Sequence, residues 1–205
     1  SENQVIQEVS IHALARLAET RDPETGNHLR RTQEYVRALG HALRDHPRFC
    51  HRLNDRIIAT LARSAPLHDI GKVGIPDHIL LKPGKLTPAE WEIMKTHAIL
   101  GSEAIAQAER DAAKAVEFLA VAKEIAHFHH EKWDGTGYPE ALKGEEIPLS
   151  ARLMALADVF DALINRRVYK PPMPYGEARD IIMGGRGSQF DPDVADAFLQ
   201  VFDQF

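Results

Sequence analysis

Residues 64–72 carry a histidine and an aspartate side by side, shortly after a proline. Pro66 lacks the amide hydrogen for the helical bond four residues back, so a helix arriving here should loosen before His68. Gly71 would give the backbone room to turn after Asp69. Adjacent side chains on a regular helix diverge by about 100°, so this pair can hardly hold one ion together. Because a carboxylate has two oxygens that can bridge two ions, the segment indicates a metal cluster if further ligands exist.

The composition is that of a soluble globular protein of 205 residues, long enough for one sizeable core. Its net charge of −5 provides no overall basic field for nucleic acid, so an anionic substrate would need a local positive site. The single cysteine, Cys50, excludes an internal disulfide framework. No apolar run approaches the ~18 residues of a membrane span, and no signal segment opens the chain. A cytoplasmic protein is the default expectation, and the initial Ser1 indicates a processed or excised fragment.

Helical periodicity accounts for most of the chain, and no segment alternates strictly as a strand would. We therefore predict an all-α fold of about seven to nine helices, with a linker or first helix over 1–21 and a single domain over 22–205. The apolar residues of helix 2–21 are Val5, Ile6, Val9, Ala13 and Leu17, and those of helix 29–46 are Tyr35, Val36, Leu39 and Leu43. Further helices are expected over about 54–69, after the capping box Thr87–Glu90, over 113–128, after a Ser150 cap, over about 175–184, and after Asp191–Pro192.

Three candidate ligands, Glu24, His28 and His97, lie in predicted helical segments in the first half of the chain. Glu24 and His28 are four residues apart and face the same way if a helix continues between them. An exposed polar turn is the alternative for this pair. His97 lies on the helix that the capping box opens, and could equally be an ordinary core histidine.

Three further candidate ligands, His129, His130 and Asp158, lie in the second half of the chain. His129 and His130 end the helix 113–128 and precede a glycine-rich loop, which is not what a packed core needs. Asp158 lies on the following helix and shares a face with Asp161. The alternative for either aspartate is a salt bridge to Arg152 or Lys170.

Taken together, the candidates comprise five imidazoles and three carboxylates, which exceed what one ion can hold and imply two or three ions. With no cysteine among them a structural zinc site is disfavoured, whereas mixed nitrogen and oxygen ligands suit iron, manganese, nickel or zinc. Clustered ions lower the pKa of bound water and stabilise an in-line displacement at phosphorus. Lys72, Arg167 and Lys170 would add the fixed cations that a phosphodiester requires.

Four motifs give the chain a specific resemblance. They are His68-Asp69-Ile70-Gly71-Lys72, the block from His129 to Pro139, the segment Ala157–Leu163, and Phe190-Asp191-Pro192. From about residue 8 to 203 the sequence resembles an HD-GYP domain, a branch of the HD metal-dependent phosphohydrolases. The resemblance implies hydrolysis of the bacterial second messenger cyclic di-GMP to linear pGpG, and often on to GMP.

The resemblance also implies roles for individual residues. Asp69 would bridge two ions, iron or manganese, with an attacking hydroxide between them. Lys72 would hold the scissile phosphate, with Arg167 and Lys170 on the substrate's phosphates. The loop Gly137-Tyr138-Pro139 would shape the pocket mouth or a partner surface.

Two positions bear on how far the family pattern extends. Family members with a glutamate at the position of Glu24 can hold three ions, so this chain is expected to have two or three. Many members have Thr-Ser-Asp before the arginine where this chain has Ile164-Asn165-Arg166, which leaves the substrate contacts less defined than the metal ligands.

The resemblance extends to partners and leaves alternatives open. It implies a cyclic dinucleotide substrate and an upstream receiver or sensor domain, and it allows diguanylate cyclase domains or a second copy of the chain as partners. The first alternative is an HD-GYP module that binds partners without catalysis. The others are an HD enzyme that acts on another cyclic dinucleotide or nucleotide, and a di-iron oxygenase, against which the complete Gly-Tyr-Pro block and the three cations argue.

Overall fold

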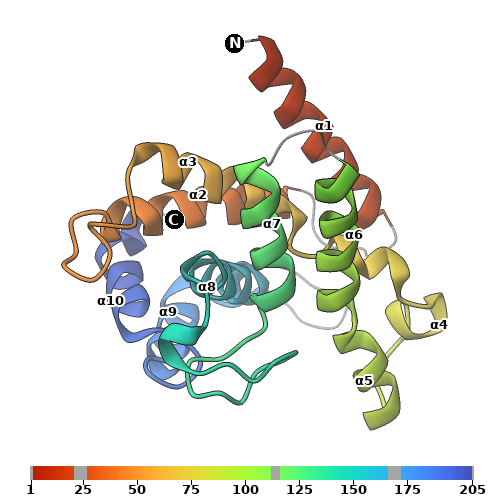
Figure 1. Ribbon diagram of the computed structural model, residues 1–205. Coiled ribbons are helices and arrows are strands. Elements are labelled where there is room, and N and C mark those ends of the chain that lie inside the picture. The colour runs from red at the N-terminus through yellow and green to blue at the C-terminus, as the bar shows by residue number, and fades with distance from the viewer. Residues whose placement is uncertain (1, 21–26, 112–115, 166–171, 205) are drawn as a thin grey trace.

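The computed structural model describes residues 2–20, 27–111, 116–165 and 172–204, with side chains from residue 9 onward. Within these ranges the chain is mostly helical and contains no strand (Figure 1). The all-α prediction is therefore confirmed, with nine helices of eight residues or more and one single-turn helix in the described ranges. The helices are α1 (Glu2–Glu19), α2 (His28–Leu43), α3 (Asp55–Ser64), α4 (Asp77–Leu80), α5 (Pro88–Lys95), α6 (His97–Asp111), α7 (Glu117–Phe128), α8 (Leu149–Ile164), α9 (Tyr175–Gly184) and α10 (Pro192–Val201).

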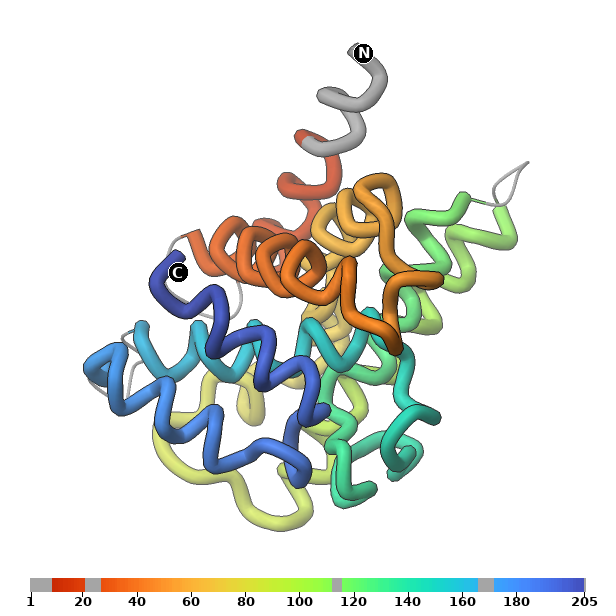
Figure 2. Tube along the Cα trace, turned by 90° about the vertical axis from the view of Figure 1, so that its left-hand side faces the viewer, coloured from red at the N-terminus to blue at the C-terminus, as the bar shows by residue number. Residues whose placement is uncertain are grey.

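The larger core lies between α2, α3, α8, α9 and α10. Its centre is Phe160 of α8, on which Tyr35 of α2 and Phe198 of α10 pack edge-to-face with ring centroids 5.4 and 5.1 Å away. The predicted apolar stripe of α2 is buried here, which confirms that helix's orientation. Figure 2 shows α2, α8 and α10 side by side in this core. Their packing brings the start of α2 against the middle of α8.

A smaller core joins α1, α6 and α7. The predicted apolar residues Val5 and Ile6 lie outside the described side chains of α1. For the rest of the helix the predicted apolar face is wrong, because Val9 and Leu17 are 63% and 66% exposed, and the buried face consists of Ile11, Ala15 and Ala18. The reason lies in the size of the side chains, since two alanines let α1 approach the short turns that follow α3 more closely than larger residues would. α1 therefore packs against the two 3₁₀ turns within residues 65–74.

The helix starts follow local chemistry in two of three predicted cases. Thr87 forms the expected capping box with Glu90, and Asp191 caps α10 by accepting from the amide of Asp193. Ser150 is not a cap, because α8 begins one residue earlier and the Ser150 hydroxyl donates to Glu124 on α7 instead. Among the described helices, none combines the length and the apolar character that crossing a bilayer requires.

Candidate metal centre

Asp69 is the centre of the candidate site. One carboxylate oxygen, Oδ1, lies 3.3 Å from Nε2 of His97 and 3.5 Å from Nε2 of His129. The other, Oδ2, lies 3.3 Å from Nε2 of His68 and 2.7 Å from the Lys72 ammonium. Because the two oxygens face different histidines, Asp69 has the geometry of a bridging carboxylate.

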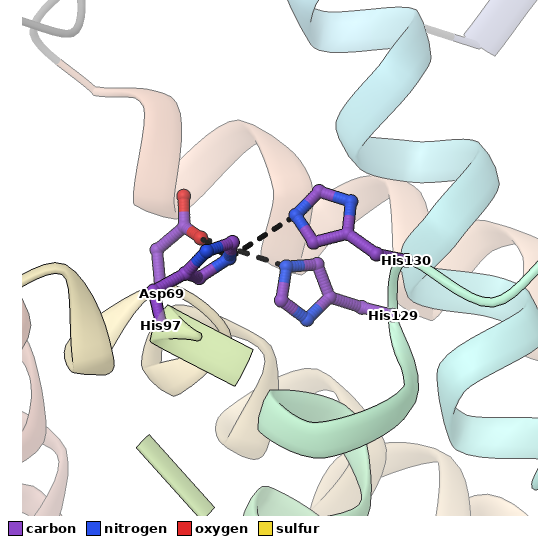
Figure 3. Close-up of side chains that lie close together, drawn as sticks. All are labelled: Asp69, His97, His129 and His130. Carbon is purple, nitrogen blue, oxygen red and sulfur yellow. Dashed lines mark hydrogen bonds and ion pairs between the residues drawn. The ribbon is translucent and has the colours of Figure 1, made fainter. Parts of the chain in front are cut away.

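The predicted ligands form two groups around this carboxylate, and in each the ligand atoms lie within 4.8 Å of one another. In the His97 group, Nε2 of His130 is 3.2 Å from Nε2 of His97 (Figure 3). In the His28 group, Nε2 of His28 is 3.5 Å from Nε2 of His68, and Asp158 Oδ1 lies 3.9 and 3.8 Å from these two nitrogens. The His97 group consists of Asp69, His97, His129 and His130, and the His28 group of His28, His68 and Asp158.

The backbone around Asp69 explains how it reaches both groups. As predicted from Pro66, α3 ends at Ser64 and continues as a 3₁₀ turn before His68. Gly71 lies in the 3₁₀ turn Ile70–Gly74 directly after Asp69, without a left-handed φ. Its missing side chain instead permits close approach, because a Cβ would overlap the carbonyl oxygen of His97 and the amide nitrogen of Gly101. The segment after Asp69 therefore packs directly against the start of α6.

Three of the histidines are oriented by backbone carbonyls of their own turn. Nδ1 lies 2.9 Å from the Ala65 carbonyl in His68, 2.7 Å from the Met94 carbonyl in His97, and 2.9 Å from the Ile125 carbonyl in His129. A carbonyl oxygen can only accept, so in each ring Nδ1 carries the hydrogen and Nε2 faces the site. This arrangement is the one that a metal-binding imidazole uses.

His28 is oriented differently, by a side chain that the sequence analysis did not assign to the site. Its Nδ1 donates to Asp161 Oδ2 at 2.7 Å, and the Arg31 guanidinium holds the same carboxylate at 2.6 and 3.0 Å. Asp161 is buried and carries a pKa below its usual range, because hydrogen bonds from His28 and Arg31 outweigh the cost of burial. The predicted salt bridge of Asp161 to Arg152 is wrong, since Arg152 pairs with Asp191 at 2.8 Å.

Asp158 likewise does not pair with Arg152 and points to the histidines. The alternative partner Lys170 lies outside the described residues, as do Glu24 and Arg167. The signal that could have identified the Asp161 contact was its spacing, because Asp161 is three residues after Asp158 and Arg31 is three residues after His28. Two pairs at helical spacing on different helices predict a contact only once the helices are known to pack together.

The loop after His130 is held closed by a buried glutamate. The Glu131 carboxylate accepts from the backbone amides of Glu140 and Leu142 at 2.7 and 3.1 Å. Gly137 lies so close to the start of the loop that a Cβ would overlap the backbone of residues 130–132. This explains the glycine of the Gly-Tyr-Pro motif, because only a residue without a side chain fits there.

Tyr138 is the residue that this loop brings onto the site. Its ring stacks on His130 with a centroid distance of 4.8 Å and an interplanar angle of 24°. Burial, together with the negative charges of Asp69 and Asp158, raises the pKa of Tyr138, so the phenol keeps its proton. The predicted role of the loop at the pocket mouth remains a prediction, supported by this stacking on a candidate ligand.

Several titratable groups of the site have shifted pKa values, which burial and neighbouring charges cause. Burial lowers the pKa of His68, but the charges of Asp69 and Asp158 outweigh it and raise the pKa to about 9. Although burial opposes the charge on Asp69, Lys72 and His68 hold the pKa of this carboxyl well below its usual range. Burial also lowers the pKa of His129, which is neutral at pH 7.

Two atoms of the His97 group lack the partners that buried polar atoms normally have. Asp69 Oδ1 and His129 Nε2 are buried, lie 3.5 Å apart and form no hydrogen bond with the described residues or with each other. A carboxylate oxygen and an imidazole nitrogen that face the same space fit a divalent cation, which binds both atom types. The residues present therefore fit a metal.

The fold and site define a helical domain with a buried histidine–aspartate cluster able to hold divalent metal ions. A family model described as HD domain matches residues 12–194, and the chain belongs to this family. The resemblance to HD-GYP domains predicted from the motifs is confirmed with it.

Named proteins give the comparison more detail. The chain is 61% identical to a "Probable cyclic di-GMP phosphodiesterase" from Vibrio cholerae, over 95% of this chain and 44% of that protein. It is 41% identical to a "3'3'-cGAMP-specific phosphodiesterase 2" from the same organism, over 95% of this chain and 35% of that one. The solved structure of an HDG"Y"P protein from Bdellovibrio bacteriovorus has the same fold, with a TM-score of 0.59, 21% identity and coverage of 84% of this chain and 51% of that one. The chain thus spans less than half the length of the first two relatives.

Proposed function

We propose that this chain is a metal-dependent phosphodiesterase domain that hydrolyses cyclic di-GMP to pGpG, and in part on to GMP. The observation that carries the proposal is Asp69, whose two oxygens face two separate groups of candidate ligands. Displacement at a phosphodiester requires charge stabilisation at both the attacking and the leaving oxygen, which two neighbouring cations supply. Identity of 61% to a probable cyclic di-GMP phosphodiesterase supports this substrate.

The metal ligands in this proposal are the seven described residues of the His97 and His28 groups, and the ions are iron or manganese. When bound, they would lower the pKa of a water molecule and polarise the phosphate. The protein's own part is to fix the imidazoles, which the hydrogen bonds at Nδ1 do. Asp161 does the same for His28 and leaves Nε2 for the metal.

Lys72 is proposed to hold an oxygen of the scissile phosphate. Its ammonium lies 2.7 Å from Asp69 Oδ2, so it is already at the edge of the cluster. A lysine there adds a fixed positive charge where negative charge develops during the displacement. Arg167 and Lys170 are proposed to bind the phosphates of the substrate, and Tyr138 and its neighbours Gly137 and Pro139 to shape the mouth of the pocket.

A third ion is proposed to depend on Glu24, which would offer a carboxylate beside His28. A third cation next to two others is repelled unless a negative group offsets its charge. Glu24→Ala should therefore remove about one metal per chain and slow hydrolysis without abolishing it. Elemental analysis of the parent and the variant, prepared identically, tests this, and equal metal contents would favour a binuclear site.

The wider setting is part of the same proposal. We infer that the domain over 22–205 works behind an upstream receiver or sensor domain in the cytoplasm, with α1 as the linker. Diguanylate cyclase domains and a second copy of the chain are the proposed protein partners. A module that only binds partners is disfavoured by the described ligand groups, in which every predicted position is filled.

The substrate is tested directly by anaerobic loading with iron or manganese, followed by chromatography of cyclic di-GMP and of 3'3'-cGAMP. Linearisation of cyclic di-GMP is the expected result. Cleavage of 3'3'-cGAMP alone would favour the second candidate, which the 41% identity to a cGAMP-specific relative supports. Turnover of neither by the metal-loaded protein would contradict the proposed activity.

A further inference from the structure

Helix α5 is firmly held at its start, yet contributes no buried side chain to the core. Thr87 and Glu90 cap it reciprocally, and Lys82 reaches the Glu90 carboxylate at 2.6 Å. The helix lies at the start of α6, beside α4 (Figure 1). A short helix in a protein is normally stabilised by the apolar face that it buries. Because α5 buries no such face, we asked what its exposed side chains contact.

Of the α5 side chains that contact Tyr138, Lys95 is charged and Trp91 is aromatic. The Trp91 ring is edge-to-face with Tyr138, with a centroid distance of 6.0 Å and an interplanar angle of 84°. Tyr138 in turn stacks on His130 of the His97 group. Two successive ring contacts therefore connect Trp91 to a candidate metal ligand, while 45% of the Trp91 surface remains exposed.

Tyr138 itself is engaged by protein groups. His130 stacks on its ring, and the Lys95 ammonium lies over the ring 5.8 Å from its centroid. Trp91 is thus the ring of this cluster that offers an exposed aromatic surface next to the site. Its partner Tyr138 and the capped start of α5 would hold that surface in place without further ordering cost.

We propose that Trp91 is the stacking platform for one purine base of the cyclic dinucleotide while a phosphate lies at the metal centre. This inference rests on the proposed phosphodiesterase function and names a specific base contact within it. Every purine has a π-face, so stacking supports guanine and adenine alike and contributes affinity rather than base selection.

The experiment compares the metal-loaded parent with Trp91→Ala, Trp91→Phe and the control Ile93→Ala. Ile93 lies on the same helix and is similarly exposed, at 42%, so it reports any effect of removing an apolar side chain from α5. Three quantities are measured for each: KM and kcat for cyclic di-GMP, the inhibition constant of inorganic phosphate, and the metal content. Under the proposed function, inorganic phosphate would bind at the same metal centre, but it has no base to stack on Trp91.

Trp91→Ala should raise KM about tenfold, within the range for removing an aromatic platform beneath one base, and change kcat less. Trp91→Phe should recover most of this loss, and Ile93→Ala should behave as the parent. Metal content and phosphate inhibition should stay unchanged in all three, and KM for 3'3'-cGAMP should rise by the same factor wherever it is a substrate. An unchanged KM in Trp91→Ala, or an equal rise in Ile93→Ala, overturns the inference while leaving the function intact. A parent that neither binds nor cleaves a cyclic dinucleotide overturns both.

Discussion

The two ligand groups differ in what holds their histidines. In the His97 group, backbone carbonyls orient His97 and His129. In the His28 group, His28 depends on Asp161, a carboxylate from α8 that Arg31 clamps from α2. A backbone carbonyl is present whatever the residue, whereas the carboxylate can be lost by a single substitution. His68 of the second group is also held by a backbone carbonyl, so the difference between the groups lies in His28, which a side chain holds.

This difference has an energetic consequence. A carboxylate behind an imidazole raises the basicity of the ligand nitrogen, and losing such a partner typically costs about 10–100-fold in metal affinity. A carbonyl acceptor polarises the ring less strongly but cannot be mutated away. We therefore expect the two groups to respond to different substitutions, except at Asp69, whose carboxylate faces both groups.

Removing Asp69 should impair metal binding in both groups, so the groups should no longer differ in their response. In Asp69→Ala both groups lose the carboxylate that faces them, so the protein should lose bound metal and all hydrolysis of cyclic di-GMP. The helical circular dichroism should persist, because Asp69 is not part of either apolar core. Elemental analysis and chromatographic assay measure the two losses.

The matched control is Asp180→Ala, which removes an exposed aspartate of α9 that pairs only with its neighbour Arg179 among the described residues. It should keep parental metal content and turnover. Hydrolysis that continues at the parental rate in Asp69→Ala would exclude a bridging role for this carboxylate.

Asp161→Asn should weaken metal binding in the His28 group and leave the His97 group unchanged. The amide has nearly the same shape but no charge, so it holds the His28 ring less firmly and leaves the Arg31 guanidinium without its carboxylate. Metal affinity of the His28 group should fall about 10–100-fold, whereas the His97 group keeps its ion. Titration with a chelator, followed by metal analysis, should show one ion released early.

The control for this prediction is the double variant Asp161→Asn with Arg31→Met, which also removes the partly buried guanidinium that has lost its carboxylate. It should regain part of the thermal stability lost in Asp161→Asn, because a charge taken partly out of water is costly when its carboxylate is removed. It should not regain metal affinity. Recovery of the affinity in the double variant would mean that Asp161 serves only to neutralise Arg31.

The same difference explains which parts of the site could be predicted from sequence. The histidines at the ends of helices and the His-Asp pair were identifiable because local breaks such as Pro66 mark them. The structure brings seven of the eight predicted ligands into the two groups, and Glu24 lies outside the described residues. Local sequence motifs were thus sufficient to predict most of the candidate ligands.

The contacts that could not be predicted are long-range. The hydrogen bond from His28 to Asp161 spans 133 residues, and its existence depends on α2 packing against α8. Nothing in the periodicity of α8 distinguishes a carboxylate that pairs with Arg31 from one that pairs with Arg152. The exposed face of α1 was misjudged for a similar reason, because two faces of that helix carry apolar residues and only packing chooses between them.

A substitution that moves the backbone should weaken metal binding in the His97 group, as Asp161→Asn should weaken it in the His28 group. In Gly71→Ala the new Cβ would overlap the His97 carbonyl oxygen and the Gly101 amide, so the start of α6 must move. Overpacking of this kind typically costs about 1–3 kcal/mol of unfolding free energy. Chemical denaturation and metal titration should show lower stability and weaker binding at the His97 group.

Gly176→Ala is the matched control, because the residue is helical and a Cβ added there would meet no neighbouring group of the described chain within 4 Å. Alanine there should leave metal binding unchanged and raise stability by about 0.5–1 kcal/mol through helix propensity. Equal effects of the two glycine substitutions would mean that close approach at Gly71 does not matter to the site.

The smallest effect is expected at α5, outside both groups, and it depends on pH. Hydrogen bonds from Lys82 and from the Thr87 amide lower the pKa of Glu90 to about 2. Because this folded-state pKa lies below the ordinary glutamate value of 4.5, the Glu90 carboxylate stabilises the folded protein above about pH 4.5, and this contribution fades as the pH falls through about 2. The stability difference between the parent and Glu90→Gln should therefore be largest near neutral pH, shrink on acidification, and decrease in high salt because the pair is partly exposed to solvent. Lys82→Met should return the pKa of Glu90, followed by NMR of its carboxyl carbon, toward 4.5, whereas metal content should not change in either variant. A pKa of Glu90 that stays near 2 in Lys82→Met would show that the Thr87 cap alone fixes the start of α5.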